Sequence, residues 1–396
     1  MMLLVLLVSL GTTVHGDSVR VRPPASVSQA ADVAHPLTSA AEVGMRLSEL
    51  LKAEGAVVEE VQRGGFPGAA LAIGRWDRTV VERGFGRTDW TLGSPEVNPE
   101  LTIYDLASLT KVIAATTAVM LLVEDGRMQL DAPVSRYLPD FIGNGKDGVT
   151  IRHLLAHNSG LPAGADIWAT TPEGSLNRAI RVPLKARPGQ QVEYSDIGFV
   201  VLWAAAEAAN GGPLYRLLDE RVFGPLEMRS TTFLPGSWCD RCAPTEQRKD
   251  GTDFRGVVHD PTARRLGGIT GNAGLFSTVH DLTRFASMLA TGGELDGHRI
   301  LKSETIRTFT SRQAGAGTRA LGWDTPSRGG TGAAGVQISS AAFGHTGFTG
   351  TSLWIDPERG TWVILLANRT YQPRAPNRIQ AVRRAVHDWV AVAAAP

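Results

Sequence analysis

Hydrophobic and polar positions follow two different periods along this chain. Strand-like alternation occurs only toward the two ends, where it is flanked by helical spacing, and helical spacing dominates the middle. The turn Asp356-Pro-Glu-Arg-Gly360 separates two apolar runs and is a hairpin signal. The elements predicted near the two ends are a helix over 40–54, strands over 69–73, 79–85, 351–355 and 361–366, and a closing amphipathic helix over 376–392. Strands from both ends therefore favour one antiparallel sheet that is flanked by terminal helices.

Helical spacing dominates the middle of the chain. Val112–Val123 carries no charged residue, which predicts a buried helix that begins near Ser108 and ends at Gly126. Further helices are predicted over 151–157, 196–210, 214–222 and 281–289. The pattern predicts an α/β fold of the α+β type, with an α/β lobe from residues 40–105 and 300–393 and an inserted helical lobe from residues 106–299.

The amino terminus predicts export. Residues 1–16 contain a short apolar core before a possible cut at Asp17, as in a signal peptide, and residues 17–39 have the composition of a flexible leader. We therefore expect a secreted or periplasmic protein without a membrane span. Forty basic and 39 acidic residues give a net charge of +1, which indicates no bulk attraction to nucleic acid or to anionic membranes.

Two cysteines occur, Cys239 and Cys242. A single C-x-x-C offers two of the four ligands of a structural zinc site, so a local disulfide is the expectation in an exported protein. His153 and His157 have the i, i+4 spacing of some zinc sites, but no third ligand is evident and we interpret them as structural. His259 is interpreted as a loop histidine.

Ser108 and Lys111 stand three residues apart at the head of the long apolar run. Residues i and i+3 share a helix face, so the hydroxyl and the amine are expected to meet. Partial desolvation against an apolar helix lowers the pKa of a lysine, which predicts that Lys111 is able to accept the Ser108 proton. A Ser-x-x-Lys motif is common, however, and by itself it indicates no more than an ordinary helix start.

Two further motifs follow in positions where a cleft between the lobes is expected. Tyr194-Ser-Asp196 precedes the helix predicted over 196–210, and His345-Thr346-Gly347 precedes the late hairpin. A tyrosine hydroxyl near a lysine ammonium can transfer protons, and glycine permits a close approach of another chain. Each motif alone is also compatible with a core tyrosine or a simple glycine turn.

Together the three motifs resemble those of the β-lactamase and penicillin-binding-protein superfamily, in particular its class C-like serine hydrolases. The resemblance extends to Leu130-Asp-Ala-Pro-Val and to the run from Ile151 to Pro162, and it covers about residues 40–393. It implies a β-lactamase/transpeptidase-like fold in which Ser108 attacks a carbonyl, Lys111 and Tyr194 share the proton transfers, and no metal or cofactor is needed. It also implies an oxyanion hole from the N–H groups of Ser108 and Phe348.

The substrate-binding residues implied by the resemblance are Asp196, His345, Thr346, Gly347 and Phe348. His345 replaces the family's commoner lysine, and Asp196 replaces an asparagine. A neutral imidazole attracts a carboxylate less than an ammonium does. Asp196 either weakens the binding of acidic substrates or stabilises a protonated Lys111.

The predicted function is that of an exported serine hydrolase, a D-Ala-D-Ala carboxypeptidase that acts on peptidoglycan stem peptides. The alternatives are an esterase for small acyl esters, a β-lactamase, and a non-enzymatic penicillin-binding sensor module.

Overall fold

The computed structural model describes residues 37–236, 239–327, 329 and 332–395. The predicted signal peptide and residues 17–36 of the predicted leader lie outside the described residues.

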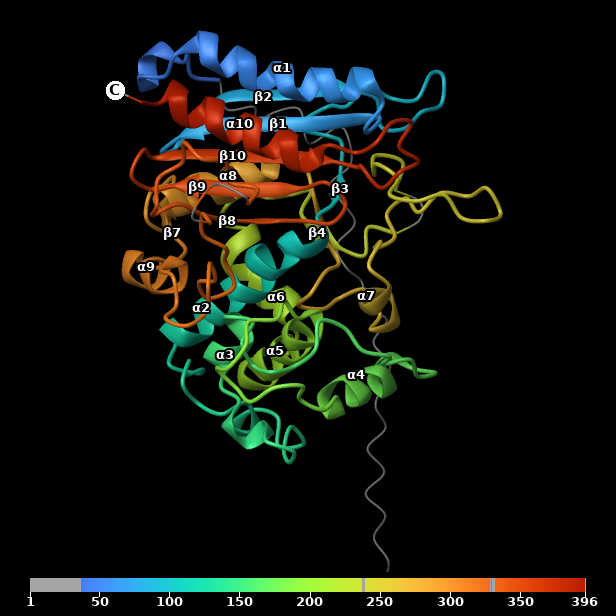
Figure 1. The fold of residues 1–396 in the computed structure, drawn as a ribbon, viewed down its shortest axis with the longest axis vertical. Helices are drawn as coiled ribbons and strands as arrows, with labels where there is room; N and C mark the ends of the chain where they lie inside the picture. The colour runs from blue at the N-terminus through green and yellow to red at the C-terminus, as the bar shows by residue number, and fades with distance from the viewer. Residues whose placement is uncertain (1–36, 237–238, 328, 330–331, 396) are drawn as a thin grey trace, which may run out of the picture.

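A five-stranded antiparallel sheet in the order β2-β1-β10-β9-β8 forms the centre of the upper part of the molecule in Figure 1. Its strands are β1 (Gly68–Arg75), β2 (Arg78–Gly86), β8 (Phe343–Thr346), β9 (Ser352–Asp356) and β10 (Thr361–Ala367). β1 pairs with β10 from Ala69↔Ala367 to Arg75↔Thr361, so the two chain ends meet at the centre of the sheet. The predicted fold class is confirmed.

Both faces of the central strands are buried because helices cover each side. α1 (Leu47–Arg63) and α10 (Ile379–Ala393) pack together over one face, as Figure 1 shows in blue and red, and α8 (Val279–Ala290) packs against β1, β9 and β10. Successive side chains of β1 alternate between the faces. Leu71 and Ile73 join the cluster under α1 and α10, whereas Ala70 and Ala72 join the large core that includes α8. This double burial explains the nearly continuous apolar runs in β1 and β10.

A helical part lies beside the β8 edge of the sheet. Its helices are α2 (Thr117–Glu124), α3 (Ile151–Leu155), α4 (Pro172–Arg181), α5 (Asp196–Asn210) and α6 (Leu214–Leu218). The remaining elements are α7 (Pro261–Arg265), α9 (Ser303–Thr310), the small sheet of β3 (Tyr104–Asp105), β5 (Leu275–Ser277) and β4 (Thr232–Phe233), and the hairpin of β6 (Glu294–Leu295) and β7 (His298–Arg299). The predicted lobe boundaries stay a prediction; α8 lies within the segment 106–299 and packs on the sheet.

Three predicted helices differ clearly from the observed ones. The helix expected over 214–222 is α6 followed by a π-helical segment at Asp219–Phe223. The helix expected over 40–54 begins only at Leu47, because Gly44 adopts a positive φ of 66° and ends a short 3₁₀ turn at Ala41–Val43. The helix expected after Ser108 has three parts: a 3₁₀ turn at Ala107–Leu109, a π-helical segment at Lys111–Thr116, and α2. Such π segments are frequent at functional sites.

The apolar stretch Ala107–Glu124 is long enough to cross a bilayer, but 83% of it is buried inside the fold. It is therefore the core helix of the helical part. Cys239 and Cys242 form the expected local disulfide and pack with Ile103, Val258 and Phe276.

Candidate active site

Ser108 is presented by a backbone turn that several side chains hold in place. The preceding residue, Ala107, has a φ of +47°, a left-handed conformation that costs a non-glycine residue about 1–2 kcal/mol. The buried carboxylate of Asp105 accepts hydrogen bonds from the N–H of Ala107 at 2.8 Å and from the N–H of His259 at 2.6 Å. The hydroxyls of Thr349 and Thr351 donate to the carbonyls of residues 105 and 106. These bonds stabilise the strained turn and join it to the turn after β8.

Lys111 lies fully buried beneath Ser108, at the start of the π-helical segment. Its ammonium donates to Ser108 Oγ at 3.1 Å, to Asp196 Oδ1 at 2.6 Å and to the carbonyl of Asn272 at 2.9 Å. All three ammonium protons therefore have an acceptor.

The predicted lowering of the Lys111 pKa is wrong. Burial does act in that direction, but the charges of Tyr194 and Asp196 outweigh it and hold the pKa of Lys111 above its ordinary value. Of the two roles that the sequence left open for Asp196, its carboxylate adopts the geometry of the second, a partner of protonated Lys111.

Tyr194 lies on the loop immediately before α5. Its ring is surrounded by the side chains of a lysine, an arginine and two histidines. Its ring centroid lies 4.8 Å from Lys111 Nζ, 4.5 Å from the ring centroid of His157 and 5.9 Å from that of His345. The guanidinium of Arg319 lies 5.3 Å from the same centroid. Ser108, Lys111 and Tyr194, which are distant in the sequence, are thus brought together as predicted.

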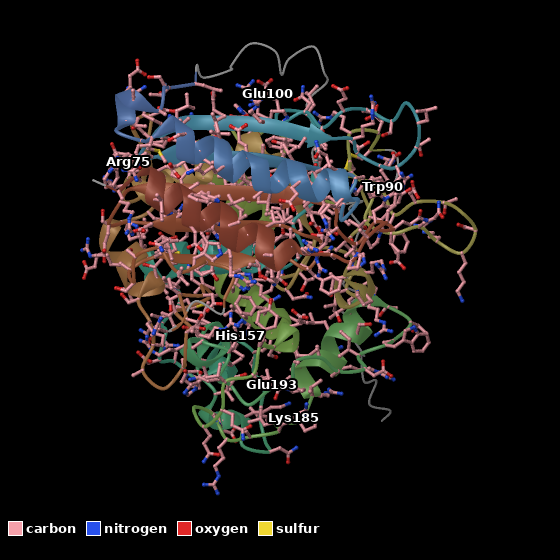
Figure 2. The ribbon with its side chains drawn as sticks, turned by 45° about the horizontal axis from the view of Figure 1, so that its top comes forward. Arg75, Trp90, Glu100, His157, Lys185 and Glu193 are labelled. Carbon is pink, nitrogen blue, oxygen red and sulfur yellow. A yellow bond between two sulfur atoms is a disulfide. The ribbon has the colours of Figure 1, made fainter. Side chains whose placement is uncertain are left out.

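His157 holds the loop that carries Tyr194. Its Nδ1 accepts the N–H of Ser195 at 3.0 Å, and its carbonyl accepts the N–H of Glu193 at 2.9 Å, so the residues on both sides of Tyr194 are bonded to it. Figure 2 shows His157 and Glu193 together in the helical part. His157 therefore has a structural role, which is to hold the loop that carries Tyr194.

His345 forms the opposite wall, on the edge strand β8. Its Nδ1 lies 2.9 Å from the carbonyl of Thr346, and its Nε2 is buried without a hydrogen-bond partner among the described residues. Burial, with the positive charges of Arg319 and Lys111, holds the pKa of His345 well below its usual range. The imidazole is neutral at pH 7, in agreement with the sequence-based expectation.

The two N–H groups predicted to form the oxyanion hole are available. In the part of the chain that the structure describes, neither the N–H of Ser108 nor that of Phe348 donates to a protein acceptor. The N–H of Gly347, by contrast, is bonded to the carbonyl of Thr351 at 2.7 Å. Glycine is required at 347 because a Cβ there would lie 2.5 Å from the carbonyl oxygen of Leu106.

A cavity of about 560 Å³ opens over Ser108. The predicted residues that line it are Ser108, Tyr194, His345, Thr346, Gly347 and Phe348. Lys111, which donates to Ser108, and Asp196, which pairs with Lys111, are not among the lining residues. Three arginines that the sequence reasoning missed, Arg319, Arg369 and Arg383, also line the cavity. They come from segments without a motif, so only their convergence in the fold reveals them.

The fold and the site together define a serine hydrolase of the β-lactamase and penicillin-binding-protein superfamily, and the comparisons with known proteins agree. The family model described as Beta-lactamase matches residues 53–387, and the chain belongs to this family. A protein of Salmonella agona (strain SL483) named "Putative D-alanyl-D-alanine carboxypeptidase" is 28% identical over 377 residues, which cover 85% of this chain and 87% of that protein.

Solved structures share the fold. A penicillin-binding protein homolog from Caulobacter crescentus superposes with a TM-score of 0.71 at 22% identity, over 88% of this chain and 99% of that one. EstCE1, described as a hydrolase with promiscuous acyltransferase activity, superposes with a TM-score of 0.69 at 23% identity, over 86% of this chain and 99% of that one. At this level of identity the likeness concerns the fold alone.

Proposed function

We propose that the protein is a D-Ala-D-Ala carboxypeptidase that acts on peptidoglycan stem peptides through an acyl-enzyme on Ser108. The observation that carries the proposal is the excess of cations in the cavity over Ser108: Arg319 is paired with Asp324 at 3.8 Å, whereas Arg369 and Arg383 have no carboxylate partner among the described residues. A substrate with a free carboxylate next to the scissile bond needs such a cation, because His345 is neutral. A small neutral ester does not need it. The name of the Salmonella relatives supports the same reaction.

The chemistry follows from the geometry. Ser108 Oγ attacks the carbonyl carbon of the penultimate residue while Tyr194, in its phenolate form, accepts the Ser108 proton, and the N–H groups of Ser108 and Phe348 stabilise the oxyanion. Tyr194 then protonates the leaving amine, the C–N bond breaks and D-alanine departs. Water hydrolyses the resulting ester and regenerates Ser108. Lys111 remains an ammonium throughout and stabilises negative charge on Tyr194.

The test compares three substrates on purified protein: a peptide that ends in D-Ala-D-Ala, nitrocefin and p-nitrophenyl acetate. We expect release of D-alanine, its loss in Ser108→Ala, and a fall of about 10²- to 10⁴-fold in kcat in Tyr194→Phe, which keeps the ring but removes the hydroxyl. Turnover of the ester without release of D-alanine would contradict the peptidase proposal and favour an esterase, for which the neutral His345 is the specific structural argument. Hydrolysis of nitrocefin alone would favour a β-lactamase.

Export completes the proposal, because peptidoglycan lies outside the cytoplasmic membrane. Mass spectrometry of the protein secreted from an expression host is expected to find an amino terminus near Asp17. An unprocessed amino terminus in the cytoplasm would refute export.

A further inference from the structure

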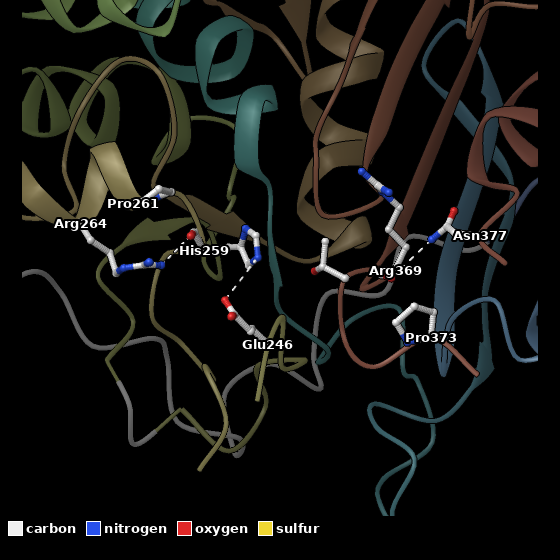
Figure 3. Close-up of a pocket in the computed structure, with 8 residues that line it drawn as sticks. Glu246, His259, Pro261, Arg264, Arg369, Pro373 and Asn377 are labelled. Atoms are coloured by element: carbon white, nitrogen blue, oxygen red, sulfur yellow. Dashed lines mark hydrogen bonds and ion pairs between the residues drawn. The ribbon is translucent and has the colours of Figure 1, made fainter. Parts of the chain in front are cut away.

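A second cavity of about 540 Å³ lies next to the one over Ser108. Figure 3 shows its two sides, which come from distant parts of the chain: one from the region of α7, the other from the connection between β10 and α10. Glu246, His259 and Arg264 line the first side, and Arg369 lines the second.

A stack of side chains separates the two cavities. Phe348, which lines the Ser108 cavity, stacks on His259 at a ring-centroid distance of 5.6 Å, and His259 lines the second cavity. Arg369 lines both cavities, lies 4.7 Å from the Phe348 ring and donates to the carbonyl of Phe348 at 2.6 Å. The second cavity is therefore within reach of a substrate that extends beyond Phe348 and Arg369.

The second cavity has an excess of positive charge. Within the described ranges, neither Arg264 nor Arg369 forms an ion pair within 4 Å of a carboxylate. Arg264 donates to the carbonyl of Val258 at 2.9 Å and interacts at longer range with the buried Asp105. Glu246 is the acid in the lining, and it is exposed. Its neighbour at 3.7 Å, His259, has a pKa lowered by burial and does not add a full charge at pH 7.

The arginines are also partly removed from water. This holds for Arg369, whose pKa is lowered by burial. A desolvated cation without a counter-ion carries an energetic cost. A bound anion offsets that cost, and a planar guanidinium matches the two oxygens of a carboxylate.

We propose that the second cavity is a subsite for a carboxylate of the substrate that is remote from the scissile bond. The inference rests on the proposed function, since the carboxylate belongs to the peptide that Ser108 cleaves. It adds a preference that the Ser108 cavity alone does not provide: acidic peptides bind better than their neutral amides.

The experiment uses pairs of N-acetylated peptides that end in D-Ala-D-Ala and differ only in glutamate or glutamine at successive positions before the D-alanines. Their affinities for the full chain carrying Ser108→Ala are measured by calorimetry, so binding is read without turnover. At one position we expect the glutamate peptide to bind about tenfold more tightly than its amide partner, which corresponds to one charge-assisted contact.

Three further substitutions in that background locate the subsite. Arg264→Gln is expected to remove the preference without changing the affinity for the glutamine peptide. Glu246→Gln is expected to increase the preference, because it removes the opposing charge. Glu304→Gln, an exposed acid on α9, serves as the matched control and leaves the preference unchanged.

Equal affinities at every position, failure of the glutamate peptides to bind, or a preference that persists in Arg264→Gln would each overturn the subsite. Release of D-alanine by the wild-type protein is measured separately. A charge preference without D-alanine release would refute the peptidase function and leave the subsite standing.

Discussion

Tyr194 and Asp196 together hold Lys111 in its charged form. The 2.6 Å contact between Lys111 Nζ and Asp196 Oδ1 contributes to the raised pKa of the buried lysine, so the ammonium form persists at neutral pH. We therefore propose that Lys111 is an electrostatic partner of Tyr194 and not the acceptor of the Ser108 proton.

Asp196→Asn tests this assignment. Loss of the carboxylate charge lowers the pKa of Lys111, so the ammonium is lost at a lower pH. We expect the alkaline limb of the kcat/KM–pH profile to move toward neutral pH, while the acidic limb stays in place. A shift of the acidic limb instead would mean that neutral Lys111 is the base. Glu304→Gln provides the control with an unchanged profile.

Asp105 stabilises the turn that presents Ser108. Because its carboxylate is buried, its contribution to the free energy of unfolding depends on pH. Burial raises the pKa of this carboxyl from 3.8 to about 6, although the N–H groups of His259 and Ala107 oppose the shift. Between these two values the folded protein holds a proton that the unfolded chain has lost. The stability contributed by this group therefore falls as the pH rises from about 4 to about 6 and is constant above that.

Asp105→Asn is expected to remove this dependence. The free energy of unfolding of the variant minus that of the wild type should rise by about 2 kcal/mol between pH 4 and pH 7, measured by urea denaturation. The same variant should lower kcat, because an asparagine offers one carbonyl oxygen where two N–H groups need acceptors. A stability difference that is independent of pH would refute the raised pKa of Asp105.

At the scale of elements, the site depends on how closely the turn after β8 approaches the nucleophile turn. Gly347 makes this approach possible, since a Cβ there would lie 2.0 Å from Thr351 Oγ1 and 2.5 Å from the carbonyl oxygen of Leu106. The oxyanion donors Ser108 and Phe348 belong to the two turns that meet here. Their spacing is therefore set by backbone contact between elements.

Gly347→Ala should separate the two turns. We expect a loss of about 1–3 kcal/mol in stability, the usual cost of overpacking, together with a large fall in kcat. Thermal unfolding and ester hydrolysis measure the two effects. Gly55→Ala in α1, where an added Cβ meets nothing within 4 Å, is the matched control and should be stabilising by about 0.5–1 kcal/mol. Wild-type activity in Gly347→Ala would contradict the role of the close approach.

At the scale of the whole molecule, the apolar cluster that α1 and α10 form over the sheet serves stability, although α10 also carries Arg383, which lines the cavity over Ser108. The cluster packs on the sheet face opposite α8 and includes the fully buried Leu50. We expect Leu50→Ala to reduce the free energy of unfolding by about 2–5 kcal/mol with no change in kcat/KM. Leu51→Ala, at a 53% exposed position of the same helix, should cost less than about 0.5 kcal/mol. A loss of kcat/KM in the folded Leu50→Ala protein would show that this cluster is coupled to the site.

Local patterns predicted most of the elements because periodicity reports directly on burial. The helix over 196–210 and the late hairpin were found within a residue of their observed bounds. The start of α1 and the π-helical segment were missed, since a glycine turn and a local change of helical pitch leave no mark on the hydrophobic pattern. The direction of the Lys111 pKa was wrong for a related reason: burial is readable from an apolar run, but a carboxylate 85 residues away is not.

The sequence by itself determined the motifs and their order, and through them the residues Ser108, Lys111 and Tyr194 and the neutral character of His345. These features depend on residue type and on short spacing, which one-dimensional patterns retain. Only the tertiary structure decided that Asp196 partners Lys111, that Asp105 joins the nucleophile turn to His259, and that arginines from unrelated segments surround the cavity over Ser108. Electrostatic energies depend on distance and desolvation, and both are fixed only when the chain folds.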